Sequence, residues 1–278
     1  MDLSSLYQRV SFSIVSLIIR SGIGFYLGII YAKHLGVESF GMYSFLLATF
    51  LALCNFIDLG VGNAFFTFLS KGENSKAIFK IFIFWVLIQY LCVSIIVYLS
   101  DGFLEYFFHT NDQYIIFISF TAVFFQQTIA KSISYVFESV REPVFSQSLM
   151  LASSILTLVL ILTLREFFEL SVDNIFLAIF FVNVIMLAYS LKRIRLITSK
   201  SIDDMPILEA VIKYYKFCLP LFIMALFTFA FKYFDTWYLQ YTGGSSEQAF
   251  YAVAFKFSSI SLILSTAIGR ILWKEIAH

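Results

Sequence analysis

Four positively charged side chains interrupt stretches of this sequence that are otherwise apolar, namely Arg20, Lys131, Lys232 and Lys256. A cation near the centre of a membrane helix costs about 2.5–3.5 kcal/mol on insertion scales, so it usually faces a protein interior or a water-filled cavity. Few acidic residues lie in the same stretches to balance these charges, and Lys256 has no acidic residue near it. The four cations therefore predict a pathway through the protein that accepts anions.

Three of these cations also have a purely structural interpretation. Lys131 could extend its ammonium group to the nearer membrane surface. Lys232 has Asp235 three residues further on, on the same helical face, so the two could form a local ion pair. Arg20 has no acidic residue in its own stretch, and Asp58 in the next stretch is the nearest candidate. Asp58 and Asp235 are accordingly predicted to be charge partners or ion-coupling residues.

The composition indicates a membrane protein made of helices. Hydrophobic residues make up 60% of the 278 residues and charged residues only 13%, about half the share in soluble domains. The first apolar stretch is too long for a cleavable signal peptide. Stretches of membrane-spanning length predict an all-α membrane protein with about eight transmembrane helices, at about 10–32, 40–62, 78–99, 113–137, 144–164, 172–191, 217–240 and 248–270.

The spacing of these stretches divides the chain into unequal parts. Residues 1–191 hold six predicted helices, and residues 192–216 form a linker that contains six Lys and Arg residues. Residues 217–278 hold the last two helices. The segments Gly36–Tyr43 and Gly244–Tyr251 resemble each other. The first follows the stretch with the central Arg20 and the second follows the stretch that contains Lys232, which suggests repeated halves of the kind common in transporters.

The basic residues outside the apolar stretches predict the orientation. With a cytoplasmic N-terminus, thirteen Lys and Arg residues fall on the cytoplasmic side and only Lys33 and Arg165 on the other. Both termini are therefore predicted to be cytoplasmic. At about 1.5 Å per residue, Arg20 then lies roughly 16 Å from the cytoplasmic surface, Lys131 about 10 Å, and Lys232 and Lys256 a little above 20 Å. The four cations are thus predicted to form a ladder across the membrane.

No pattern in the sequence predicts catalysis, a metal or a cofactor. Cys54, Cys92 and Cys218 are widely separated in apolar stretches, and the three histidines have no ligand spacing. No nucleophile elbow, phosphate-binding loop or paired carboxylates are present. We therefore expect no enzyme activity, no cofactor and no nucleic-acid partner.

Several segments resemble a known family of membrane proteins. The segment His34–Tyr43 after the Arg20 stretch, the Asp-Leu-Gly pattern that starts at Asp58, and the segment Lys216–Leu221 are similar to polysaccharide biosynthesis proteins of the Wzx type. These are the O-antigen and capsule flippases of the multidrug/oligosaccharidyl-lipid/polysaccharide exporter superfamily, which has a MATE-like fold.

The resemblance implies two six-helix lobes around a cavity that opens to alternate sides of the bacterial inner membrane. The substrate would be an oligosaccharide linked to undecaprenyl pyrophosphate, used for O-antigen, capsule or exopolysaccharide biosynthesis. Arg20, Lys131, Lys232 and Lys256 would line the path of its pyrophosphate and glycan. Membrane lipids surround such a protein, and a glycan polymerase and a chain-length regulator would be its protein partners.

The sequence departs from this family in length and leaves other functions open. About four helices of the second lobe are missing, so we expect a truncated form of a longer flippase. A cation-coupled multidrug exporter of the same fold is one alternative, which would need an acidic residue such as Asp58 in its cavity. A membrane-embedded glycosyltransferase or polymerase is another, although the outer connections are short for one.

Overall fold

The computed structural model of the protein describes residues 3–72, 76–99, 112–140, 142–199 and 205–276, and all regular elements in these ranges are helical. The elements are α1 (Leu3–His34), α2 (Val37–Ile57), α3 (Val61–Ser70), α4 (Lys76–Leu99), α6 (Gln113–Phe124), the π-helix η1 (Phe125–Ile129), α7 (Ala130–Ser139), α8 (Pro143–Phe167), α9 (Val172–Ser199) and α10 (Ile207–Ile276).

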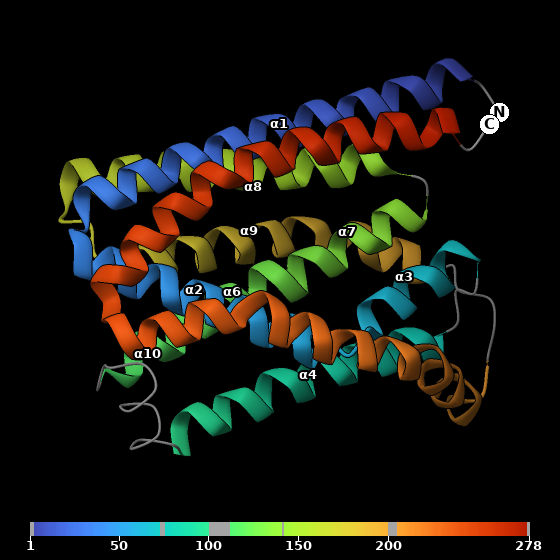
Figure 1. The fold of residues 1–278 in the computed structure, drawn as a ribbon. Coiled ribbons are helices and arrows are strands. Elements are labelled where there is room, and N and C mark those ends of the chain that lie inside the picture. Colours follow the sequence, from blue (N-terminus) through green and yellow to red (C-terminus); the bar gives the residue numbers. More distant parts are fainter. Residues whose placement is uncertain (1–2, 73–75, 100–111, 141, 200–204, 277–278) are drawn as a thin grey trace.

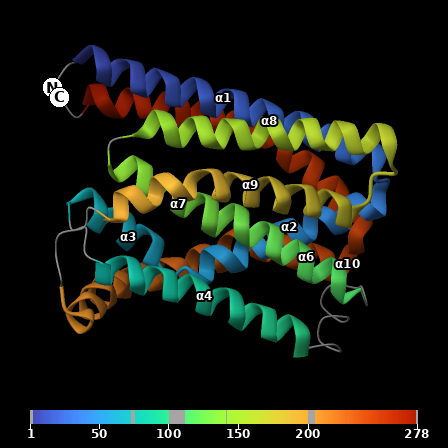
Figure 2. The ribbon, with the colours of Figure 1, turned by 180° about the vertical axis from the view of Figure 1, so that it is seen from behind.

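Seven of the described helical segments are long and apolar enough to cross a membrane. The last of them runs from Ile207 to Ser258 and contains a sharp break at Gly244, whose φ is 70°. Only glycine adopts this left-handed conformation at low cost. Figures 1 and 2 show that α10 changes direction here and returns along the bundle, so its two legs correspond to the predicted spans 217–240 and 248–270. The predicted multi-pass helical fold is confirmed.

Two predicted spans are divided in the structure. The span predicted at 40–62 ends as α2 at Ile57, and the short helix α3 begins at Val61 after a tight turn with Gly60 at φ 83°. The span predicted at 113–137 contains the π-helix η1 between α6 and α7. A π-helical turn inserts a residue into the hydrogen-bond ladder and often marks a functional site.

The helices form one elongated bundle whose ends gather at two opposite sides (Figures 1 and 2). The start of α1 and the ends of α7, α9 and α10 lie at one side, and the ends of α1 and α8 lie at the other with the bend at Gly244. This is the alternation that the distribution of basic residues predicts.

Phenylalanine side chains fill the centre of the bundle around α2. Phe40, Phe45 and Phe50 of α2 are at most 2% exposed and pack with Phe120 of α6 and Phe176 of α9 in one hydrophobic cluster. Burying a side chain of this size stabilises a fold by about 1.5–3 kcal/mol in water, a gain that membrane interiors replace by close packing. The core therefore holds α2 in a central position, with α6, α9 and α10 around it.

The first leg of α10 packs along the whole length of α2. Trp237 donates a hydrogen bond from Nε1 to Oγ1 of Thr49 at 3.1 Å. Gly41 lies directly against the backbone of Ser245, and Gly60 lies against the side chain of Leu221. These three contacts show that the segments before and after residue 192 pack closely against each other. The predicted domain boundaries stay a prediction.

Candidate functional site

Arg20 lies in the middle of α1 and reaches toward α8. Its Nη2 donates to Oε1 of Gln147 at 2.9 Å, and its Nη1 contacts Sδ of Met150 at 2.9 Å. The Nε–H is buried and has no hydrogen-bond partner among the described residues. A thioether is a weak acceptor, so the guanidinium group has donors that the protein itself leaves poorly satisfied.

A carboxylate that the sequence did not single out lies near Arg20. Asp58 was the nearest candidate in the sequence, and Glu138 of α7 interacts electrostatically with Arg20. The amide of Gln147 connects the two, because its Nε2 donates to Oε1 of Glu138 at 3.1 Å. Glu138 comes near Arg20 because α1 packs mainly on α8, which in turn packs on α7. The predicted role of Asp58 as a charge partner stays a prediction.

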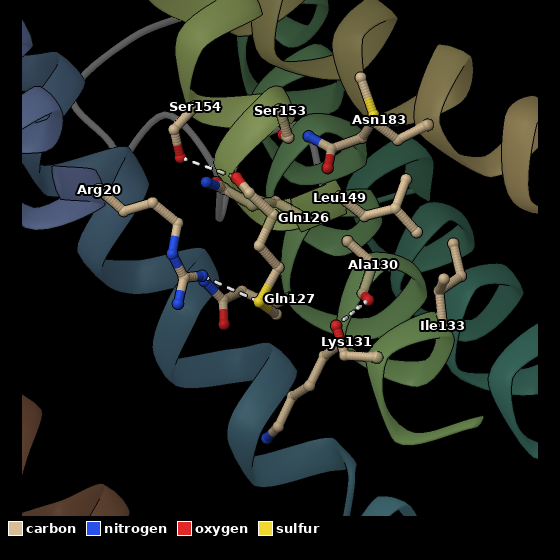
Figure 3. Close-up of a pocket in the computed structure, with 13 residues that line it drawn as sticks. Arg20, Gln126, Gln127, Ala130, Lys131, Ile133, Leu149, Ser153, Ser154 and Asn183 are labelled. Carbon is tan, nitrogen blue, oxygen red and sulfur yellow. Dashed lines mark hydrogen bonds between the residues drawn. The ribbon is translucent and has the colours of Figure 1, made fainter. Parts of the chain in front are cut away.

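A cavity of about 390 Å³ opens beside the guanidinium group and is called the Arg20 cavity below. Arg20 reaches into it from α1, Lys131 from α7 and Asn183 from α9 (Figure 3). The π-helix η1 contributes Gln126 and Gln127 to the wall. The cavity thus combines two cationic side chains with several amide groups, and Ser153 and Ser154 of α8 add hydroxyl groups.

Lys131 links the Arg20 cavity to a second one. Its side chain is exposed, its Nζ lies 5.6 Å from the centre of the Tyr135 ring, and Figure 3 shows it pointing away from Asn183. A second cavity of about 350 Å³, the Asp58 cavity, is lined by Asp58, Lys131, Phe229 and others. Lys131 therefore stands in the walls of both cavities and interacts electrostatically with Asp58.

Asp58 has a clear local role at the end of α2. Its Oδ1 and Oδ2 accept hydrogen bonds from the backbone N–H of Gly62 at 3.1 and 3.3 Å. This carboxylate satisfies an N–H group in the first turn of α3 and interacts favourably with the helix dipole. The side chain thus stabilises the N-terminus of α3 and also supplies the acidic group of the Asp58 cavity.

Lys256 lies apart from Arg20 and Lys131. It lines a third cavity of about 340 Å³, the Lys256 cavity, between α1 and the second leg of α10, together with Lys33 and the aromatic rings of Phe25 and Phe257. Its Nζ is 5.5 Å from the centre of the Phe40 ring. A cation over an aromatic face gains about 0.5–2 kcal/mol, which explains structurally how this lysine is accommodated.

The other predicted residues are less well defined. Lys232 belongs to the first leg of α10, but its side chain lies outside the described residues, so its predicted pairing stays a prediction. Asp235 is exposed. The structure therefore brings Arg20, Lys131 and Asp58 to adjoining cavities and places Lys256 elsewhere. In the described part of the chain, no three His, Cys, Asp or Glu residues lie close enough to hold a metal ion.

Sequence reasoning missed Gln126, Glu138, Gln147 and Asn183. Each is a polar residue within or next to a predicted membrane helix, which is a signal of the same kind as the cations but weaker. Their importance depends on contacts between helices that are distant in the sequence, such as the pairing of Arg20 with Gln147.

Comparisons with known proteins place the chain in a family. A family model described as "Polysaccharide biosynthesis protein" matches residues 6–272. A search of curated proteins found no match. Among solved structures, a mutant of the MATE transporter VcmN from Vibrio cholerae matches with a TM-score of 0.50 and 14% sequence identity, covering 95% of this chain and 63% of that chain. This chain, whose membrane helices have the fold of a MATE transporter, therefore belongs to the polysaccharide biosynthesis protein family.

Proposed function

We propose that this protein is a flippase that moves an oligosaccharide linked to undecaprenyl pyrophosphate across the bacterial inner membrane by alternating access. Membership of the polysaccharide biosynthesis family and the transporter fold support this proposal. The distribution of basic residues supports cytoplasmic termini.

The observation that carries the proposal is the state of the Arg20 guanidinium group. It lines a cavity of about 390 Å³, its Nε–H has no partner among the described residues, and its Nη1 faces only a sulfur atom. None of the described carboxylates forms an ion pair with it. Arginine binds phosphate through two parallel hydrogen bonds, which are about twice as strong as bonds between neutral groups. A pyrophosphate in this cavity would satisfy donors that the protein leaves open.

The remaining wall of the Arg20 cavity suits the rest of such a substrate. Lys131 supplies a second positive charge, and opposite charges that are desolvated together offset part of the cost of leaving water. Gln126, Gln127 and Asn183 offer both donors and acceptors to sugar hydroxyl groups. An undecaprenyl tail would stay in the surrounding lipid while the charged head group crosses.

The Asp58 cavity favours a second candidate, a cation-coupled multidrug exporter. Asp58 and the aromatic rings of Phe56, Phe229 and Tyr233 line it together, and acidic and aromatic groups are what an organic cation binds. Lys131 also lines this cavity and offsets the charge of Asp58. We therefore favour the anionic substrate, and efflux of ethidium from cells that express the protein would distinguish the exporter.

Translocation in liposomes tests the proposed function. The full chain is reconstituted with a fluorescent undecaprenyl-pyrophosphate oligosaccharide, and an impermeant quencher reports which leaflet holds the label. We expect Arg20→Ala to slow translocation by about tenfold or more, as the loss of a charged hydrogen bond would, and Arg20→Lys to fall between because it keeps the charge but not the planar fork.

The matched control is Arg165→Ala, because Arg165 lies near the end of α8, pairs with Glu166 and is remote from the Arg20 cavity. Its rate should equal that of the unsubstituted protein. A full rate for Arg20→Ala at equal protein content would contradict the proposed role of Arg20. No protein-dependent translocation at all would contradict the proposal that this chain by itself is a flippase, and would agree with the expectation of a truncated form.

A further inference from the structure

Glu138 carries an interaction that neither the family nor the sequence pattern assigns. This half-buried carboxylate of α7 accepts two hydrogen bonds at its Oε1, from Oγ of Ser146 and from Nε2 of Gln147, both at 3.1 Å. Ser146 is fully buried. The carboxylate is therefore fixed in place by α8, at the side of Gln147 that faces away from Arg20.

This arrangement determines which way the amide of Gln147 points. A side-chain amide has a donor end and an acceptor end. Because Nε2 donates to Glu138, Oε1 must face Arg20, and it accepts from Nη2 at 2.9 Å. If Glu138 could not accept, the amide could turn its NH2 group toward the guanidinium, where two donors would meet.

The same arrangement keeps the negative charge one residue away from Arg20. A carboxylate in direct contact would form a bidentate pair and occupy two of the five guanidinium donors. Through Gln147, Glu138 balances the charge of Arg20 electrostatically and uses only one donor. The buried Nε–H, which has no partner among the described residues, and the Nη1 group that faces Met150 are then not taken up by a carboxylate.

A hydrogen bond between the two helices supports the same alignment. Oγ of Ser16, one turn before Arg20 on α1, donates to the main-chain oxygen of Gln147 at 3.2 Å, and Ser16 is only 1% exposed. The backbone of Gln147 is thus tied to α1, so the Gln147 side chain has little freedom to follow Arg20 if the guanidinium moves.

We propose that Glu138 is a positioning residue that acts through Gln147, orienting the Arg20 guanidinium group so that it binds a phosphate oxygen of the substrate without being neutralised by a direct ion pair. This inference rests on the proposed function, because it assumes that Arg20 binds the pyrophosphate. It also explains how Arg20 could select anions. Because Gln147 stands between the Glu138 carboxylate and the Arg20 guanidinium group, most of the guanidinium donors remain available to a bound anion.

An exchange of the two groups separates positioning from simple structural support. In the double variant E138Q/Q147E, the same two side-chain types are present and the net charge is unchanged. The hydrogen bond between residues 138 and 147 can form with donor and acceptor exchanged, and Arg20 can still donate to residue 147. A network that only stabilises the fold would tolerate the exchange. Positioning would not, because Glu at 147 contacts Arg20 directly.

The probe is inorganic pyrophosphate, added to the purified full chain in lipid nanodiscs and measured by calorimetry. Phenylglyoxal, which modifies free arginine side chains, reports on Arg20 itself through mass spectrometry. We expect the double variant to bind pyrophosphate about tenfold or more weakly, the size of one charged hydrogen bond, and its Arg20 to react more slowly. The single variant Gln147→Glu should behave in the same way, which keeps the test available if the double variant does not fold.

Two further variants separate a failure of the positioning role from a failure of the proposed function. Glu142→Gln is the matched control, because Glu142 lies four residues further along, pairs with Arg193 at 3.5 Å and does not line the cavity. It should bind pyrophosphate as the original does. If Arg20→Ala binds normally, the proposed function fails. If Arg20→Ala loses binding but E138Q/Q147E or Gln147→Glu keeps it within about twofold, only the positioning role is overturned.

Discussion

The contact between α2 and the bend of α10 can be tested by adding a single methyl group. At Gly41, a Cβ atom would clash with the backbone oxygen of Ser245 and lie 2.6 Å from its carbonyl carbon. Carbon atoms in good contact are about 3.5–4.0 Å apart. Because the obstacle is backbone, the two helices must move apart in Gly41→Ala, and a side-chain rotation cannot relieve the clash.

Gly24 on α1 supplies the matched control. A Cβ atom there meets no heavy atom within 4 Å. Both replacements gain the same helix propensity, about 1 kcal/mol for alanine over glycine, so this gain cancels in their difference. Overpacking costs about 1–3 kcal/mol. We therefore expect Gly41→Ala to have a free energy of unfolding about 1–3 kcal/mol below that of Gly24→Ala.

Replacement of Gly28 by alanine should have an intermediate effect on stability, which a second substitution should reverse. There a Cβ atom would clash with Nζ of Lys256 and lie 2.9 Å from its Cδ and Cε atoms, which belong to a flexible side chain. Gly28→Ala should therefore cost less than Gly41→Ala. The further change Lys256→Ala should relieve it, whereas Ser245→Gly should not relieve Gly41→Ala, since the clash there involves backbone.

Thermal unfolding of the purified proteins in one detergent measures these differences. Tryptophan fluorescence is a suitable signal, because Trp237 donates a hydrogen bond to Thr49 across the same contact. For chains of about this size, 1 kcal/mol corresponds to about 2–4 °C. Equal stability of Gly41→Ala and Gly24→Ala, or rescue of Gly41→Ala by Ser245→Gly, would refute the packing of α2 on α10.

Two more predictions concern orientation and the separate cavities. In a protein without its native cysteines, Gly243→Cys at the bend of α10 should react with an impermeant thiol reagent added outside intact cells, and Lys71→Cys should not. The opposite labelling pattern would show that the predicted orientation is reversed. Lys256→Ala should slow translocation, and the double variant with Arg20→Ala should be slower by the product of the two single factors, since sites without shared partners act additively in free energy. A double variant no slower than Arg20→Ala alone would place both residues in one site.

The fold and part of the candidate site could be predicted from the sequence. Apolar stretches of membrane length locate the helices, and the cost of burying a cation in lipid identifies Arg20 and Lys131 as residues that face a cavity. Both do line the Arg20 cavity. The helices and the cavity-facing positions depend on local composition and on the solvent around a helix, which the sequence records directly. That Arg20 and Lys131 bind substrate stays a prediction.

The partners of Arg20 could not be predicted in this way. Gln147 and Glu138 come close to it only because α1 packs on α8 and α8 packs on α7, and nothing in the local spacing of the chain specifies that pairing. Gly244 is a similar case. A turn was expected between the last two spans, but its left-handed backbone conformation and the contact of the adjoining Ser245 with Gly41 follow from the packing of α10 on α2.

The placement of Lys256 shows that the sequence predicts the depth of a residue in the membrane but not the direction of its side chain. Counting residues along a helix gives depth in the membrane at about 1.5 Å per residue, and on depth alone four cations form a ladder. The direction in which each side chain points depends on how its helix is rotated against its neighbours. Lys131 faces the Arg20 and Asp58 cavities, whereas Lys256 faces the groove between α1 and the second leg of α10, over the ring of Phe40. Under the proposed function, depth from the sequence and direction from the structure together make the pair of Arg20 and Lys131 the predicted binding site for the pyrophosphate.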